Sequence, residues 1–203
     1  MNHAPRTVAI LLFPGVELLD FAGPFEVFSA ARLTGNAPER LFTVLTVAES
    51  TEPLRCNNPV IVLPDHTLET CPPADILVVP GGQGTRSAID RTLLIDWIRT
   101  RARAAEITAS VCTGSFLLAQ AGLLDGCATT THWGSIQRLR DAFPALEVRE
   151  HTRWVDNGAI VSSAGVSAGI DMALHIVARL YGVDAARATA HWIEYDYWND
   201  DKI

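Results

Sequence analysis

Residues 107–121 read ITASVCTGSFLLAQA, and this stretch decides the fold class. Its first five residues, Ile107–Val111, form a short run of the kind found in buried strands. The chain then turns at Cys112-Thr113-Gly114 and continues into Phe116–Ala121, an apolar run that predicts a helix. Strands that pass directly into helices are typical of parallel sheets, because parallel strands need a crossover connection.

Strand and helix patterns alternate on both sides of this stretch. Further strands are predicted at Thr7–Phe13, Leu41–Val47, Ile76–Val79 and Ile160–Ser163. Helices are predicted at Pro24–Thr34, which Gly35 ends, at Thr92–Ala104, which Asp90 caps, and through Ile170, Leu174, Val177 and Tyr181, which Gly182 ends. These patterns predict one α/β domain over residues 1–203, with a doubly wound, mostly parallel sheet flanked by helices.

Two segments interrupt the alternation. Val60–Leu63 is flanked by prolines, which predicts a short strand at an edge. Val148–Val155 is followed by the turn sequence Asp156-Asn157-Gly158, so we expect a hairpin that leads into Ile160–Ser163. Neither segment changes the prediction of a single domain, because no repeat, linker or low-complexity stretch separates it from the rest.

The composition argues against several classes of protein. The 203 residues carry a net charge of −7, which disfavours nucleic acid as a partner. No run approaches the roughly 20 apolar residues of a membrane span, and the N-terminus lacks the pattern of a secretory signal, so we expect a cytoplasmic protein with no membrane partner. The four cysteines have no zinc-type spacing, so no metal is expected; they are Cys56, Cys71, Cys112 and Cys127.

The strongest candidate for chemistry is Cys112, at the predicted turn between strand and helix. Ligands of open α/β sheets bind beyond the carboxyl ends of the strands, where Cys112 is expected to lie. The helix that follows would favour the thiolate through its N–H groups and so lower the pKa of the thiol. Thr113 adds an N–H beside the sulfur, and Gly81-Gly82 follows another strand and could supply N–H groups that stabilise developing negative charge.

Three further residues are candidates for the same pocket. Asp20, within Leu18–Phe21, is either a helix cap or a partly desolvated acid with a raised pKa that exchanges protons with the thiol. His132 follows a run of small residues and either caps the next helix or lies near the pocket. Ser167 lies in a G-x-S-x-G sequence, but no later strand end presents an acid and a base. We therefore expect Ser167 to be a helix cap or a pocket-lining residue, not a hydrolase nucleophile.

Five short segments, spread over nearly the whole chain, form a specific set. They are Phe13–Val16, Leu19–Pro24, Val79–Gly82, Val111–Gly114 and Ala128–Trp133. On these segments the chain is identified as a member of the ThiJ/PfpI superfamily, which is related in fold to class I glutamine amidotransferases. The resemblance implies a flavodoxin-like fold with a nucleophile elbow at Cys112.

Within the superfamily, Asp20 and Cys112-Thr113 resemble the isonitrile hydratase branch. That resemblance implies a homodimer that adds water to a small isocyanide to give an N-substituted formamide, with Cys112 as nucleophile, Asp20 assisting it, and no cofactor. Protease-like members carry Cys-His where this chain has Cys112-Thr113, which argues against peptidase activity.

Two alternatives stay open at this point. One is another enzyme of the superfamily, glyoxalase-like or amidase-like, that also acts through Cys112. The other is a non-catalytic ligand or redox sensor related to the sensor half of AraC-type regulators, which share the Cys-Thr and T-H-W features. Because the sequence stops at Ile203, we expect no helix-turn-helix module to follow.

Overall fold

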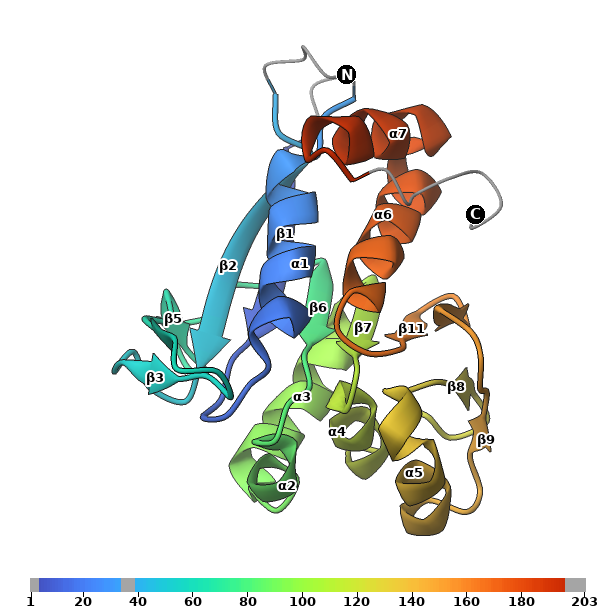
Figure 1. Ribbon diagram of the computed structural model, residues 1–203. Helices are drawn as coiled ribbons and strands as arrows, with labels where there is room; N and C mark the ends of the chain where they lie inside the picture. The colour runs from blue at the N-terminus through green and yellow to red at the C-terminus, as the bar shows by residue number, and fades with distance from the viewer. Residues whose placement is uncertain (1–3, 34–38, 196–203) are drawn as a thin grey trace.

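A seven-stranded sheet forms the centre of the structure, which is a computed structural model that describes residues 4–33 and 39–195 (Figure 1). Its strands are β1 (Arg6–Leu11), β2 (Phe42–Ala48), β5 (His66–Thr67), β6 (Ile76–Val79), β7 (Ile107–Val111), β10 (Trp154–Asp156) and β11 (Ile160–Ser163). In space they follow the order β10-β11-β7-β6-β1-β2-β5, and every neighbouring pair is parallel except β10 and β11. The predicted doubly wound, mostly parallel sheet is therefore confirmed.

Helices flank this sheet and connect its strands. They are α1 (Leu18–Ala30), α2 (Thr85–Ala88), α3 (Thr92–Ala104), α4 (Gly114–Gln120), the 3-10 helix η1 (Trp133–Ser135), α5 (Ile136–Ala142), α6 (Ala168–Tyr181) and α7 (Val183–Trp192). α1 packs against α6, while α2, α4 and α5 gather beyond the end of the sheet toward which β2 points (Figure 1). Among the described residues, no helix combines the length and the apolar character of a membrane-spanning segment.

Burial of the central strands follows from their position. Every residue of β6 and β7 is buried, as expected for parallel strands that helices cover on both faces. A second, smaller apolar cluster holds α5 against α4 and consists of Phe116, Ile136, Leu139 and Val148. The large core fixes the sheet, and the small cluster fixes the helices beyond its carboxyl end.

Helix α1 begins earlier than the sequence predicted. It starts at Leu18, so Pro24 lies inside the helix and not in its first turn. A proline inside a helix removes one backbone hydrogen bond and crowds the carbonyl four residues earlier. Tertiary contacts nevertheless support the first turn, because the N–H of Glu17 donates to the carbonyl of Gly81 at 2.9 Å. The helix also ends earlier than predicted, at Ala30, and Ala31 is already extended; Thr34 and Gly35 themselves lie outside the described residues.

Helix α3 has the predicted bounds, and Gly182 ends α6 with a φ of +92°, as predicted. The predicted cap of α3 is wrong, because Arg91 occupies the N-cap and no side chain bonds there. Asp90 lies one residue too early for its carboxylate to act as an N-cap.

The two irregular segments are shorter than predicted. Of Val60–Leu63, only β4 (Ile61–Val62) is a strand, and it pairs with β3 (Leu54–Arg55) in a separate hairpin; the edge of the main sheet is β5. The expected hairpin into β11 is present but starts at Trp154. The first part of Val148–Val155 belongs instead to β9 (Glu147–Val148), which pairs with β8 (Ala128–Thr129). Strand pairing, which the residues of a single segment do not specify, decided both outcomes.

Candidate active site

Cys112 occupies a strained turn at the carboxyl end of β7. Its φ is +58°, in the left-handed region, which costs a non-glycine residue roughly 1–2 kcal/mol. Hydrogen bonds hold this conformation: its N–H donates to the carbonyl of Ala164 at 3.1 Å, and its carbonyl accepts from the Thr131 hydroxyl at 2.8 Å and the Ser115 hydroxyl at 3.1 Å. A nucleophile elbow at this position was the expectation from sequence.

Gly114 makes this turn possible. A Cβ on Gly114 would lie 2.0 Å from the carbonyl oxygen of Val79, at the end of the neighbouring strand. No side chain fits at that distance, so the sequence Cys112-Thr113-Gly114 permits α4 to start close against β6.

Asp20 lies in the first turn of α1 and is fully buried. Its Oδ2 accepts a hydrogen bond from the N–H of Gly81 at 3.0 Å, while its buried Oδ1 has no hydrogen-bond partner among the described residues. Burial raises the pKa of Asp20 to about 7, although the neighbouring N–H of Gly81 and thiol of Cys112 oppose the rise. Of the two alternatives from sequence, the structure favours the desolvated acid over the helix cap.

The pKa of Cys112 differs from the expectation. Burial and the negative charge of Asp20 raise the pKa of the thiol to about 12, and the N–H of Thr113 only partly offsets them. The expected lowering by the helix N-terminus is therefore wrong, because burial of the thiol and, after it, the negative charge of Asp20 outweigh the hydrogen bond from the N–H of Thr113. The two acids form a coupled pair in which the sulfur keeps its proton at neutral pH.

The Gly81-Gly82 segment is positioned near Cys112 as expected, but its N–H groups are already engaged. The N–H of Gly82 donates to the Thr113 hydroxyl at 3.0 Å, and that of Gly81 is bonded to Asp20. The Thr85 hydroxyl donates to the carbonyl of Gly82 at 2.8 Å and completes the network. The expectation that Gly82 offers a free N–H to developing charge is therefore corrected, and the N–H of Thr113 is the one beside the sulfur.

A cavity of about 310 Å³ opens over the thiol. It is lined by Glu17, Asn57, Gly82, Gln83, Arg86, Cys112, Thr113, His132, Trp133, Gly134, Ser135, Arg138 and Val166. His132 thus lies at the pocket, and its Nδ1 also accepts from the N–H of Gly134 at 3.2 Å, which caps η1. The prediction that His132 lies near the pocket is confirmed, whereas the helix that it was expected to cap, α5, has Ser135 at its N-cap without a side-chain bond.

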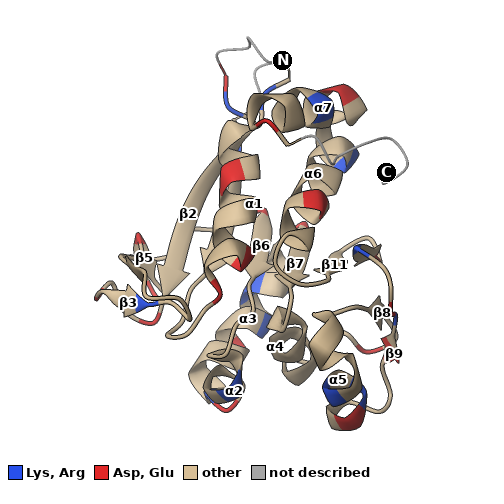
Figure 2. Cartoon of the chain, in the orientation of Figure 1, with Lys and Arg blue, Asp and Glu red and all other residues tan. Residues whose placement is uncertain are grey.

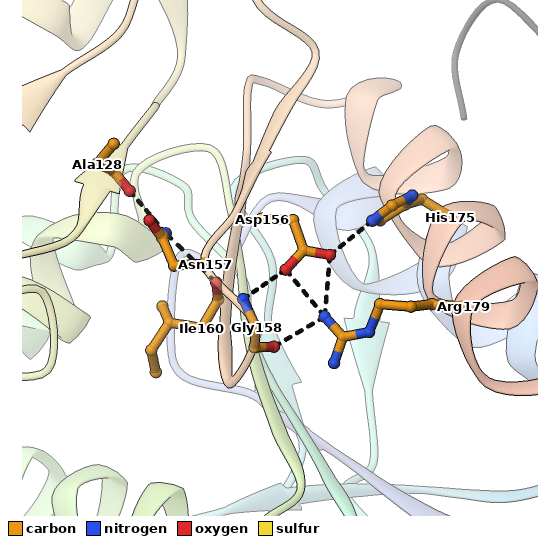
Figure 3. Close-up of polar contacts among 7 residues, drawn as sticks. All are labelled: Ala128, Asp156, Asn157, Gly158, Ile160, His175 and Arg179. Atoms are coloured by element: carbon orange, nitrogen blue, oxygen red, sulfur yellow. Dashed lines mark hydrogen bonds and ion pairs between the residues drawn. The ribbon is translucent and has the colours of Figure 1, made fainter.

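Ser167 occupies the N-cap of α6, but its side chain makes no capping bond and does not line the cavity around Cys112. Its hydroxyl accepts from Arg153 at 3.4 Å. The histidine nearest along the chain, His175, is held by Asp156 at 2.7 Å, and Arg179 contacts both oxygens of Asp156 at 2.9 Å (Figure 3). These contacts hold the β10–β11 hairpin against α6. His175 therefore has a structural role and does not serve as a general base for Ser167.

The sequence reasoning missed the two arginines of the cavity, Arg86 and Arg138. Both lie on short helices, α2 and α5, where an arginine is ordinary on a solvated face. No local pattern distinguishes an arginine that faces a pocket from one that faces water, so the sequence offered no signal for them.

The fold and the site together define a family. The profile of the DJ-1/PfpI family matches residues 6–179, and the chain belongs to this family. It is 35% identical over 188 residues to the isonitrile hydratase of Pseudomonas putida, and the match covers 93% of this chain and 78% of that protein. The crystal structure of a ThiJ/PfpI family protein from Pseudomonas syringae is 30% identical with a TM-score of 0.84, covering 97% of this chain and 78% of that one.

The chain is also similar to a regulator. It is 28% identical over 196 residues to the HTH-type transcriptional regulator GbdR of Pseudomonas aeruginosa. The match covers 96% of this chain but only 52% of the regulator. The family therefore includes both enzymes and the DJ-1-like parts of regulators, and the choice between them depends on the chemistry of the site.

Proposed function

We propose that this protein adds water to an isocyanide and releases an N-substituted formamide. The observation that carries this proposal is the buried pair of Asp20 and Cys112, whose pKa values are both raised, to about 7 and about 12. Cys112 lines the cavity, and the buried carboxyl of Asp20 interacts with its thiol, so the pair can supply a nucleophile and a proton to the same substrate atom. The 35% identity to an isonitrile hydratase is a second, independent support.

Isocyanides suit this arrangement for a chemical reason. The terminal carbon of an isocyanide carries a lone pair and must gain both a proton and a nucleophile, so both new bonds form at the same atom. Asp20 is the only buried acid among the described residues that interacts with the Cys112 thiol. The acid that moves the proton and the sulfur that attacks are therefore neighbours.

The first step forms a thioimidate. Cys112 sulfur bonds to the terminal carbon as its proton passes to the Asp20 carboxylate, and the carboxyl then gives that proton to the same carbon. The product of this step is Cys112–S–CH=N–R, and Asp20 is again a carboxylate.

The second step releases the formamide. Asp20 accepts a proton from water while the water oxygen bonds to the thioimidate carbon, and that proton passes to the nitrogen. The carbon–sulfur bond then breaks, the remaining hydroxyl proton returns through Asp20 to the sulfur, and the product is H–CO–NH–R. The N–H of Thr113, held in place through the hydrogen bond between its side chain and Gly82, would stabilise negative charge on the departing sulfur.

Formamide production from cyclohexyl isocyanide tests the proposal, with Cys112→Ala and Asp20→Asn measured beside the parent. We expect turnover by the parent, none by Cys112→Ala, and a rate lowered roughly 10²- to 10⁴-fold by Asp20→Asn, because a general acid–base group contributes that much. Full activity of Cys112→Ala would refute the nucleophile, and a parent that hydrates neither this neutral isocyanide nor a carboxylated one would refute the hydratase assignment.

A ligand sensor is the second candidate, favoured by the similarity to GbdR over 96% of this chain. Redox sensing is disfavoured, since oxidants attack the thiolate and the pKa of Cys112 is raised to about 12. A sensor would bind small molecules in the cavity and turn none of them over. The assay above separates the two functions.

A further inference from the structure

Arg138 presents its guanidinium to the cavity around Cys112 in an unusual setting. Its Nε is buried and has no hydrogen-bond acceptor among the described residues. The guanidinium stacks over the Phe116 ring, 4.2 Å from the ring centroid. Partial burial of a charged group without a counter-ion costs free energy, which an anion bound against the cavity-lining part of Arg138 would lower.

The fold holds Arg138 in this place. Ile136 and Leu139, on either side of it in α5, belong to the small apolar cluster that also contains Phe116 of α4. The cluster fixes one face of α5, so the aromatic ring and the guanidinium face each other. A side chain fixed in this way loses little conformational entropy when it binds a ligand.

A second guanidinium lies near the first. Arg86 of α2 lines the same cavity and donates to the side chain of Gln83, and Figure 2 shows basic positions on both α2 and α5. Within residues 4–33 and 39–195, neither Arg86 nor Arg138 forms an ion pair with a carboxylate. Burial and the positive charge of Arg86 lower the pKa of Arg138, while Cys112 acts to raise it. The side chains of Arg86, Arg138 and Cys112 are therefore close enough for electrostatic interaction. Two like charges that repel each other in one cavity favour the binding of an anion.

The acidic side chain in the lining, Glu17, does not pair with either arginine. Glu17, which precedes α1, accepts from the amide of Asn57 at 2.9 Å and contacts neither arginine. The cavity therefore has an acidic contribution from the α1 side and a basic wall from α2 and α5, with the Cys112 thiol in its lining.

We propose that Arg138, assisted by Arg86, binds a carboxylate of the substrate, so that the substrates are small isocyano carboxylates and the products N-formyl amino acids. Arg138 lines the cavity, and a planar guanidinium fits a carboxylate. The cavity of about 310 Å³ is at the small end of the roughly 300–1,000 Å³ of ligand pockets, which suits a molecule with few atoms between the two groups. The identity of the reacting group rests on the proposed function, whereas the carboxylate site does not.

The first experiment compares isocyanoacetate with its neutral methyl ester as substrates. Arg138→Gln should lower kcat/KM for isocyanoacetate roughly 10- to 150-fold more than for the ester, as loss of a hydrogen bond to a charged group implies. Arg138→Lys keeps the charge without the planar fork and should give an intermediate loss. Arg103→Gln removes the same charge from an exposed position of α3 and should change neither substrate. Equal losses on both substrates in Arg138→Gln would overturn the proposal.

The second experiment needs no turnover and separates this proposal from the function. Calorimetric titration compares N-formylglycine with N-formylglycinamide, which differ only in the carboxylate. The parent should bind the carboxylate at least tenfold more tightly, and Arg138→Gln should remove this preference while keeping the thermal unfolding profile of the parent. Binding of neither compound, or of both equally, would overturn the carboxylate site. Preference for N-formylglycine in a parent that hydrates no isocyanide would refute the hydratase and leave the carboxylate site standing.

Discussion

Replacing Asp20 by asparagine keeps the shape of the side chain but removes its buried negative charge, and the effect on stability depends on pH. Burial raises the pKa of Asp20 from 3.8 to about 7. The folded protein therefore binds this proton more tightly than the unfolded chain does. It follows that the contribution of Asp20 to the free energy of unfolding falls as the pH rises from about 4 to about 7.

The size of the effect follows from the same values. A tenfold change in proton affinity corresponds to 1.36 kcal/mol, so the difference between 3.8 and about 7 corresponds to about 4 kcal/mol. This is an upper estimate, since the structure relaxes around the charge. The free energy of unfolding of Asp20→Asn minus that of the parent should increase by up to about 4 kcal/mol between pH 4 and pH 8.

Urea unfolding, followed by circular dichroism at several pH values, measures this difference. Changes in other hydrogen bonds that do not depend on pH add a constant offset, which cancels when only the slope of the difference with pH is read. Asp125→Asn, which removes an exposed carboxylate, is the matched control and should give a flat difference. A flat difference for Asp20→Asn as well would refute the reasoning that Asp20 is a desolvated acid.

Three other predictions concern activity and packing. The value of kcat/KM for an isocyanide should rise as the pH passes about 7, where Asp20 becomes the carboxylate that accepts the thiol proton, and pH-rate measurements should lose this rise in Asp20→Asn. Burial acts to raise the pKa of Asp156, but hydrogen bonds from His175 and a neighbouring arginine outweigh it and the pKa is lowered. Asp156→Asn should therefore unfold about 1–3 kcal/mol more easily in urea at pH 7, and the gap should close as the pH falls through the lowered pKa of Asp156. Gly81→Ala would place a Cβ 2.5 Å from the N of Thr113 and 2.9 Å from Oδ2 of Asp20; overpacking of this kind costs about 1–3 kcal/mol, and thermal unfolding together with the formamide assay should show losses of both stability and activity.

Local sequence determined the central part of the fold. Strand β7, the turn at Cys112 and helix α3 were readable from short apolar runs and turn residues, because these signals act between residues close in the chain. The position of Cys112 beyond a strand followed from the same reasoning. The start of α1 did not, since it depends on contacts with Gly81, 61 residues from Asp20.

Tertiary structure alone decided the electrostatics of the site. The sequence suggested that a helix N-terminus would lower the pKa of Cys112, but burial beside Asp20 raises it, and burial is a property of the assembled core. The N–H of Gly82 meets the Thr113 hydroxyl only because strands far apart in the chain end together. Arg138 faces the cavity because an apolar cluster from three elements orients α5. The sequence thus specified which groups the site contains, whereas proton affinities and open donors depend on distances that only the folded chain defines.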